Sequence, residues 1–178
     1  VIGAGPIGLG AAAVAKAHGA YVTSIDLVDD RLELAKKVGI DEVINSGKEN
    51  LKERALEITN GRGFDLVVEC VGGSQEKTIQ DAFNIVRRGG RITVVGTFSD
   101  NKATIPIFTF KDSEMELIGS VGDFQAFEPC LDLISKGLIQ PKHFITHTLP
   151  LREAEKGLHM LRDKSEFVFK VILHPQED

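Results

Sequence analysis

The sequence has no tryptophan and only two cysteines, Cys70 and Cys130, which lie far apart in the chain. So few cysteines exclude a disulfide scaffold and a zinc site made of cysteines alone. The sequence also lacks an apolar run close to the roughly 20 residues of a membrane span, and no segment has the pattern of a signal peptide. We therefore expect a cytoplasmic protein with no membrane partner.

A large excess of one charge is also missing, since 21 lysines and arginines stand against 26 aspartates and glutamates, for a net charge of −5. This balance argues against a nucleic-acid partner. Low-complexity tracts, proline-rich linkers and internal repeats are absent as well. What remains is a chain of 178 residues, 42% of them hydrophobic, which suffices for one packed domain without disulfides.

Apolar strands and amphipathic helices alternate along the first half of the chain. Residues 1–3 have the composition of the end of a strand whose beginning is absent, and β-branched segments predict further strands at 21–25, 42–45, 64–70 and 91–96. Helices are expected between them over 8–20, from a cap at Asp29 or Asp30 to Gly39, around 51–58, and around 79–86 before a Gly89-Gly90 turn. Strands that are apolar on both faces need helices on both sides of the sheet. The pattern predicts an α/β fold with a doubly wound parallel sheet, a Rossmann fold.

The pattern changes after residue 104. Pro106 interrupts the apolar stretch 105–110, which suits an edge strand or a partner-binding surface and not a central strand. A strand at 116–120 and a helix ending at Gly137 complete a predicted Rossmann domain over residues 1–137. Residues 138–178 form a separate C-terminal segment, with an extended stretch at 144–149, a helix at 151–161 and a strand at 166–173.

A glycine-rich loop opens the chain, because the segment from Gly3 to Gly8 matches G-x-G-x-x-G. The motif alone is weak evidence, but here it follows a strand and begins a helix of small residues. Gly3 would permit a tight turn, Gly5 would let the backbone approach a pyrophosphate, and Gly8 would let the helix lie close to the strand. The alternative is a turn that merely needs glycine. A kinase-type loop is disfavoured, because that loop joins two antiparallel strands.

Asp26 ends the second strand, where an acidic residue would accept hydrogen bonds from the ribose hydroxyls of a bound adenosine. A carboxylate there repels a 2′-phosphate, which favours NAD over NADP. The alternative for Asp26 is a helix N-cap or a solvated acid in a turn. Arg31 also leaves two interpretations open, a cover for the adenosine or an ordinary surface arginine.

Catalytic and metal-binding patterns are missing. His143 and His147 are four residues apart in a segment that reads as extended, where they cannot share a metal ion. Glu69 lies in an apolar strand and needs a partner, but a single acid is not a catalytic group of residues. We expect no catalytic residue and no metal ligand in this chain. Surface or packing roles are expected for His18, His159 and His174, and Cys70 and Cys130 have no Cys or His neighbour at ligand spacing.

Several segments together closely resemble the medium-chain, zinc-type alcohol dehydrogenases, and within them the sorbitol, polyol and threonine dehydrogenase branch. The resemblance covers essentially the whole chain. The segments that carry it are VIGAGPIGLG at 1–10, Asp26 with RLELAKKVG at 31–39, FDLVVECVG at 64–72, RRGGRITVVG at 87–96, ELIGS at 116–120 and AEKGLHML at 154–161.

The resemblance implies a set of cofactor-binding residues. The pyrophosphate would contact the glycine loop, with Ile7 as a direct contact, Asp26 the ribose, and Arg31 the adenosine end. Residues 138–178 would pack on a catalytic domain, and residues 105–118 would pair subunits into a homo-oligomer. The full set implied for NAD is Gly3, Gly5, Pro6, Ile7, Gly8, Asp26 and Arg31, then Val71 beneath the path to the nicotinamide, then Val95, Gly96, Thr97, Ser120 and Val121 around its pocket.

One departure from the family is large, because its N-terminal domain with the Cys, His and Glu zinc ligands is not in this sequence. Zinc is expected in the complete enzyme but has no ligands here. The leading hypothesis is the NAD(H)-binding portion of a zinc-dependent alcohol or polyol dehydrogenase, which moves hydride between a secondary alcohol and nicotinamide. This portion alone is expected to be inactive. The alternatives are a non-catalytic dinucleotide-binding module for redox sensing or assembly, and a different Rossmann enzyme such as a methyltransferase.

Overall fold

The computed structural model describes residues 1–73, 75–100, 102–122, 124–163 and 166–175. Helices and strands alternate in the first half: α1 (Pro6–Ala17), β1 (Thr23–Asp26), α2 (Asp29–Lys37), β2 (Glu42–Asn45), α3 (Leu51–Ile58), β3 (Phe64–Glu69), α4 (Gln75–Ile85) and β4 (Val86–Val94). There follow α5 (Ile107–Asp112), β5 (Glu116–Gly119), α6 (Phe127–Ser135), β6 (His147–Pro150), α7 (Ala154–Asp163) and β7 (Val171–His174). Short 3-10 turns lie at Phe124–Ala126, Pro141–Phe144 and Leu151–Glu153.

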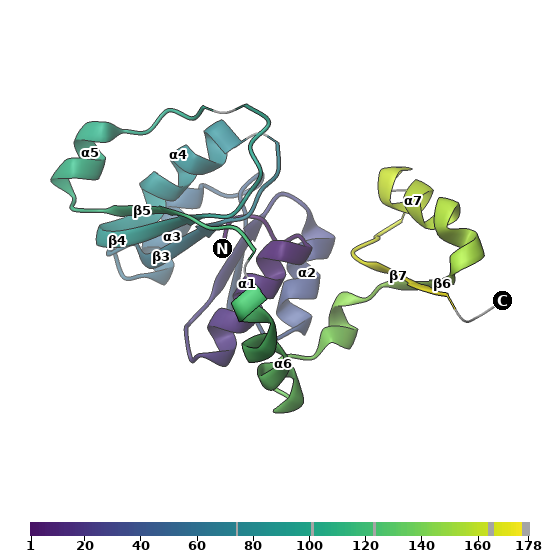
Figure 1. Cartoon of the computed structure of the whole chain (residues 1–178). Helices are drawn as coiled ribbons and strands as arrows, with labels where there is room; N and C mark the ends of the chain where they lie inside the picture. Colours follow the sequence, from purple (N-terminus) through teal and green to yellow (C-terminus); the bar gives the residue numbers. More distant parts are fainter. Residues whose placement is uncertain (74, 101, 123, 164–165, 176–178) are drawn as a thin grey trace.

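The strands of the first half are parallel and their order reverses at the N-terminus. β1 pairs with β2, and β3, β4 and β5 pair in that order. Ile2 joins the two groups, because it forms parallel bridges to Ile25 on one side and Glu69 on the other. The resulting order β2–β1–Ile2–β3–β4–β5 is that of a doubly wound sheet, with its switch point at residues 1–3. The predicted fold is confirmed, and Figure 1 shows the N-terminus at the centre of the molecule.

Two separate apolar clusters cover the two faces of the sheet. The first holds Ala55 of α3 and Ile79, Ala82 and Phe83 of α4, packed on Ile25 and the other buried strand residues. The second holds Leu9 and Ala12 of α1 and Ala35 of α2, together with Val22 and Ile40. Helices therefore lie on both faces, as the doubly apolar strands require.

The predicted cap of α2 is wrong. Neither Asp29 nor Asp30 is the N-cap, which is Val28, and no side chain caps this helix. Asp29 is the first helical residue, and its carboxylate is already bound to Asn45 and Lys48. The prediction rests on the tendency of aspartate to accept from the backbone N–H groups at the start of its own helix. Here Asn45 of β2 donates to the Asp29 carboxylate instead.

The predicted turn before β4 is also wrong. Val86, Gly89 and Gly90 all lie within β4, and no linker separates this strand from α4. The pairing starts at Phe64 with Val86, shifts, and resumes at Leu66 with Arg91. The two glycines therefore lie in an irregularity of the strand, where a Cβ on Gly90 would come within 2.6 Å of the Val86 side chain.

The edge strand predicted for residues 105–110 is wrong as well, because Ile107–Asp112 form the helix α5. Pro106 is the N-cap of that helix, a position near the helix start that tolerates proline. The strand predicted at 116–120 is confirmed as β5, and the helix predicted to end at Gly137 is confirmed as α6.

The C-terminal segment forms a small unit of its own. β6 pairs in parallel with β7, and Figure 1 shows these strands and α7 set off to one side of the main sheet. Phe169 is buried in the cluster of α1 and α2, with Phe144 and Phe167 packed nearby. Aromatic packing therefore ties this segment to the sheet domain. No helix among the described residues is long and apolar enough to cross a membrane.

Candidate functional site

The glycine loop forms the sharp turn that joins Ile2 to α1. Gly3 has a φ of +92°, a conformation that other residues rarely adopt. A Cβ on Gly8 would come within 1.7 Å of the Gly3 carbonyl oxygen, so only glycine lets α1 approach this closely. A Cβ on Gly5 would meet nothing within 4 Å, so the space beside this residue is open. The first and third glycines serve packing, and the second faces open space in which a ligand could approach the backbone.

The N-terminus of α1 begins beside this open space, and no described side chain caps it. Gly5 is its N-cap, and Pro6 is its first residue. No acidic residue lies in the first turn, and Ile7 is exposed. Free N–H groups and the positive end of the helix dipole make such a terminus suited to an anion such as a pyrophosphate.

Asp26 connects the glycine loop to the turn after β1. Its Oδ2 accepts a hydrogen bond from the Ala4 N–H at 2.7 Å, and its Oδ1 accepts from Leu27 N–H at 2.8 Å and Val28 N–H at 3.0 Å. The residue is 9% exposed, so it is neither a solvated turn acid nor the N-cap of α2. Arg31 Nη1 lies 3.3 Å from Asp26 Oδ2, which makes Arg31 an ion-pair partner of this carboxylate.

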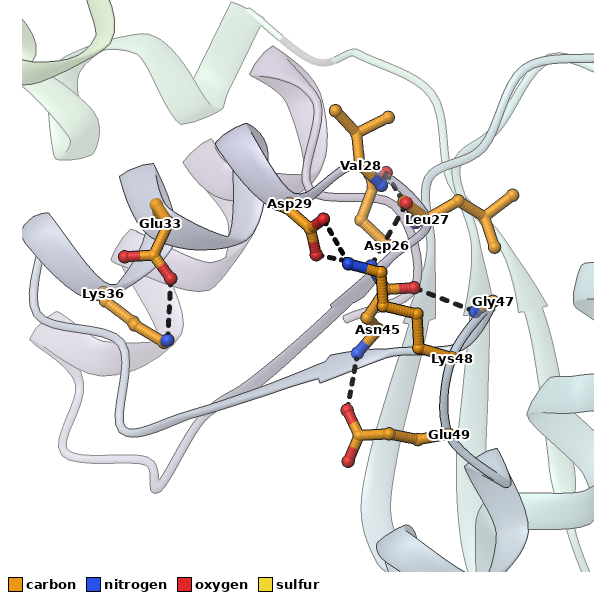
Figure 2. Close-up of polar contacts among 10 residues, drawn as sticks. All are labelled: Asp26, Leu27, Val28, Asp29, Glu33, Lys36, Asn45, Gly47, Lys48 and Glu49. Carbon is orange, nitrogen blue, oxygen red and sulfur yellow. Dashed lines mark hydrogen bonds and ion pairs between the residues drawn. The ribbon is translucent and has the colours of Figure 1, made fainter.

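A second polar layer supports this turn from β2 (Figure 2). Asn45 pairs with Asp26 in the sheet register, and its Nδ2 donates to Leu27 O at 3.2 Å and Asp29 Oδ1 at 2.7 Å. Lys48 lies 2.5 Å from the other Asp29 oxygen, and these two hydrogen bonds lower the pKa of Asp29. Sequence reasoning missed Asn45. The signal was a buried polar residue at the end of the strand beside Asp26.

A hollow of about 500 Å³ lies at the carboxyl ends of the central strands. Five of the predicted cofactor residues line it: Gly3, Gly5, Asp26, Arg31 and Val71. Its volume falls in the range of small-molecule sites. Other lining residues were not foreseen, among them Ser46 after β2 and Lys77, Thr78 and Asp81 on α4, and burial raises the pKa of Asp81. Pro6 instead lines a neighbouring hollow of about 450 Å³ with Arg31 and residues 166–169.

The remaining predicted residues lie where β4 and β5 end at the same edge of the sheet. Val95 N–H and Gly96 N–H both donate to the carbonyl of Glu69, at 2.8 and 3.0 Å, and Thr97 follows them. Ser120 N–H donates to the carbonyl of Val94 at 2.9 Å. Val121 is 89% exposed. None of these residues lines the 500 Å³ hollow.

The profile of a known family, described as zinc-binding dehydrogenase, matches residues 6–136. The chain belongs to this family. A sorbitol dehydrogenase of Halalkalibacterium halodurans is 35% identical to this chain over 178 residues, which cover 98% of the chain and 51% of the relative. An L-threonine 3-dehydrogenase of Bacillus licheniformis is 36% identical over 166 residues, which cover 91% of the chain and 47% of the relative. The resemblance inferred from the motifs is thereby confirmed.

Two solved structures agree with the fold. An alcohol dehydrogenase from Thermus sp. ATN1 is 33% identical with a TM-score of 0.88, over 97% of this chain and 50% of that one. A protein from Escherichia coli CFT073, described as a short chain alcohol dehydrogenase and solved with the cofactor NADH, is 28% identical with a TM-score of 0.86, over 97% of this chain and 50% of that one. The chain spans about half the length of the relatives that it matches.

The described residues offer no site that fits a zinc ion. Among the described residues, no group of three or more His, Cys, Asp or Glu side chains is placed to hold a metal ion. Burial raises the pKa of the Cys70 thiol to about 11, whereas a zinc ligand must be a thiolate. The described residues therefore do not fit a zinc ion.

Proposed function

We propose that this chain is the NAD(H)-binding portion of a zinc-dependent alcohol or polyol dehydrogenase. One observation carries the proposal: a buried aspartate at the end of β1 lines a hollow of about 500 Å³ and is bonded to the glycine loop that opens the same hollow. The relatives named sorbitol dehydrogenase and L-threonine 3-dehydrogenase, and the relative solved with NADH, support it.

The proposal assigns roles to the residues of the sheet edge. Gly5, Pro6, Ile7 and the α1 N-terminus bind the pyrophosphate, with Gly3 and Gly8 permitting the geometry. Asp26 accepts hydrogen bonds from the adenosine ribose, and Arg31 covers the adenosine. The nicotinamide half then lies on the other side of the switch point, against Val71 and the residues after β4 and β5, which are Val95, Gly96, Thr97, Ser120 and Val121.

The reaction proposed for the whole enzyme is hydride transfer between a secondary alcohol and the nicotinamide ring. NAD supplies the hydride acceptor when bound, and this chain binds and orients it. Residues 138–178 contribute the segment that packs on a catalytic domain. The sequence predicts no catalytic residue in this chain, so we expect the chain by itself to bind the cofactor without alcohol-dependent NADH production.

Cofactor discrimination tests the proposal at Asp26. We expect NADH to bind at least about tenfold more tightly than NADPH, because the carboxylate accepts from the ribose hydroxyls and repels a 2′-phosphate. Asp26→Asn removes this charge, keeps one acceptor for the loop, and should reduce the preference to about twofold. Fluorescence titration of the reduced cofactors measures both affinities.

Asp29→Asn is the matched control, since Asp29 is an acid of the same turn that does not line the hollow. It should leave the preference for NADH unchanged. Equal affinity of the original chain for NADH and NADPH would overturn the role of Asp26. If the chain binds neither NADH nor NADPH, the proposed function is overturned.

A further inference from the structure

Glu69 is a fully buried carboxylic acid at the carboxyl end of β3. Its Oε1 accepts hydrogen bonds from the Val71 N–H and the Thr78 hydroxyl, both at 2.9 Å. Its Oε2 is buried beside Gly96 and makes no hydrogen bond of good geometry among the described residues, and burial raises the pKa of the acid against smaller opposing effects of Thr78, Val71 and Gly96. Burying an acid with one poorly bonded oxygen costs free energy, so packing alone does not explain a glutamate at this position.

Gln75, the first residue of α4, is a second buried polar side chain beside it, only 1% exposed. Its Nε2 donates to two backbone carbonyls, Val71 O and Thr97 O, each at 2.5 Å. Its Oε1 is buried and has no hydrogen-bond partner within the part of the chain that the structure describes. The side-chain amide therefore ties the loop after β3 to the loop after β4.

The two side chains hold the same residue. Glu69 binds the N–H of Val71 and Gln75 binds its carbonyl, so both polar groups of Val71 are held by buried side chains. Gly96, in the loop after β4, packs directly against both groups. A Cβ on Gly96 would come within 2.1 Å of Val71 O and 2.6 Å of Glu69 Oε2. Direct contacts therefore hold the two loops close together, and a side chain at residue 96 would not fit between them.

The position of this cluster relative to the hollow suggests its purpose. Val71 and Thr78 line the hollow on the β3 side of the switch point, and Asp26 lines it on the β1 side. A dinucleotide that crosses the switch point places one half on each side. If Asp26 takes the adenosine ribose, the other half must extend over the ends of β3 and β4, where Val71 and Thr97 are tied together.

We propose that Glu69 and Gln75 are positioning residues, which hold Val71 and Thr97 as the wall against which the nicotinamide half of the dinucleotide lies. This inference rests on the proposed function. Neither residue touches the cofactor, because both act through the backbone of the two loops. Their loss should therefore weaken contacts to the nicotinamide half and spare those to the adenosine half.

Two ligands separate the halves, NADH and ADP-ribose, which lacks the nicotinamide. In the 178-residue chain, Gln75→Met removes both donors with little change of shape. We expect the Kd for NADH to rise about tenfold and the Kd for ADP-ribose to change less than about twofold. Gln80→Met is the matched control: Gln80 is on the same helix and donates to the backbone carbonyl of Thr104, away from the hollow. That variant should change neither Kd.

A pair of variants at Glu69 provides the second test. Glu69→Gln keeps an acceptor for Val71 and Thr78 and should leave the ratio of the Kd for NADH to the Kd for ADP-ribose unchanged. Glu69→Met removes the acceptor and should raise that ratio about tenfold. This pair decides the question if Gln75→Met does not fold. An unchanged ratio in Gln75→Met or Glu69→Met, or equal weakening of both ligands, would overturn the positioning role. If the original chain binds neither ligand, the proposed function itself fails.

Discussion

At the scale of single residues, the site depends on close approaches that only glycine permits. Gly8 lies against the backbone of Gly3. Gly10 lies two residues further along the same helix, and a Cβ on it would meet nothing within 4 Å. The two glycines therefore differ in purpose although both belong to α1. Gly8 brings α1 to the sheet, and Gly10 has no packing reason to lack a side chain.

This contrast makes a stability prediction. Gly8→Ala places a methyl group on the Gly3 carbonyl and should lower the free energy of unfolding by about 3 kcal/mol or more, since backbone on both sides resists movement. Gly10→Ala should raise it by about 0.5–1 kcal/mol, because alanine is the better helix former. Urea denaturation followed by circular dichroism measures both. Similar effects of the two substitutions would contradict the assigned role of Gly8.

The site residues that the sequence predicted are those with a local signature. The glycine loop and Asp26 have a fixed spacing along one βαβ unit, and the structure brings Gly3, Gly5 and Asp26 to one hollow. Asn45 and Gln75 have no such spacing. Asn45 matters because β2 pairs in register with β1, and Gln75 because two loops converge on it. Contacts of this kind depend on tertiary register, which periodicity along the chain does not contain.

At the scale of elements, the alternation of strands and helices was predictable because the spacing of apolar residues along a helix differs from their spacing along a strand. The errors lie at α5 and β4, where that signal is ambiguous. Ile107–Asp112 contain only six residues, too few to show a helical period, and apolar residues at an exposed surface resemble a strand. Val86 continues the apolar face of α4 and also begins β4, so no polar break marks the boundary.

We propose that α5 and β5 form the surface through which two copies of the chain associate. All four residues of β5 are exposed, including Leu117 and Ile118, and Ile107 and Phe108 of α5 are 64% and 73% exposed. An apolar, unprotected edge strand favours pairing with another strand. Light scattering should therefore find about twice the monomer mass of 19.4 kDa at micromolar concentration.

Ile118→Lys tests this surface, because a lysine on an edge strand opposes pairing and should return the chain to a monomer. Leu158→Lys in α7 is the control, since it adds the same charge at an exposed leucine outside the surface and should leave the mass unchanged. A chain that is monomeric before any substitution would refute the proposal.

At the scale of the whole molecule, residues 1–3 join the two halves of the sheet at its centre. Val1 donates from its amino group to the Thr23 carbonyl at 2.7 Å, and Ile2 bridges both neighbouring strands. Beyond Val1, a slot of about 250 Å³ continues between β1 and β3, lined mainly by apolar residues such as Val22, Leu66 and Val67. In a polypeptide that starts at Val1, a titratable amino group therefore lies in the apolar middle of the fold.

This burial makes the stability of that polypeptide depend on pH. Desolvation lowers the pKa of the Val1 amino group from 8.0 to about 6, against a smaller opposing effect of Cys70. Between pH 6 and 8 the unfolded chain binds more protons than the folded chain, so stability rises with pH and is lost as pH falls through about 6. Two pKa units correspond to about 2.7 kcal/mol.

Acetylation of Val1 provides the matched control. It keeps an N–H for the Thr23 carbonyl and abolishes the titration of the amino group, while every other group, Glu69 included, titrates in both forms. Urea denaturation at pH 5.5 and 8.5 should therefore show that the free-amine form loses about 2–3 kcal/mol more than the acetylated form. Equal losses would mean that the amino group is solvated and that the centre of the sheet is open to water.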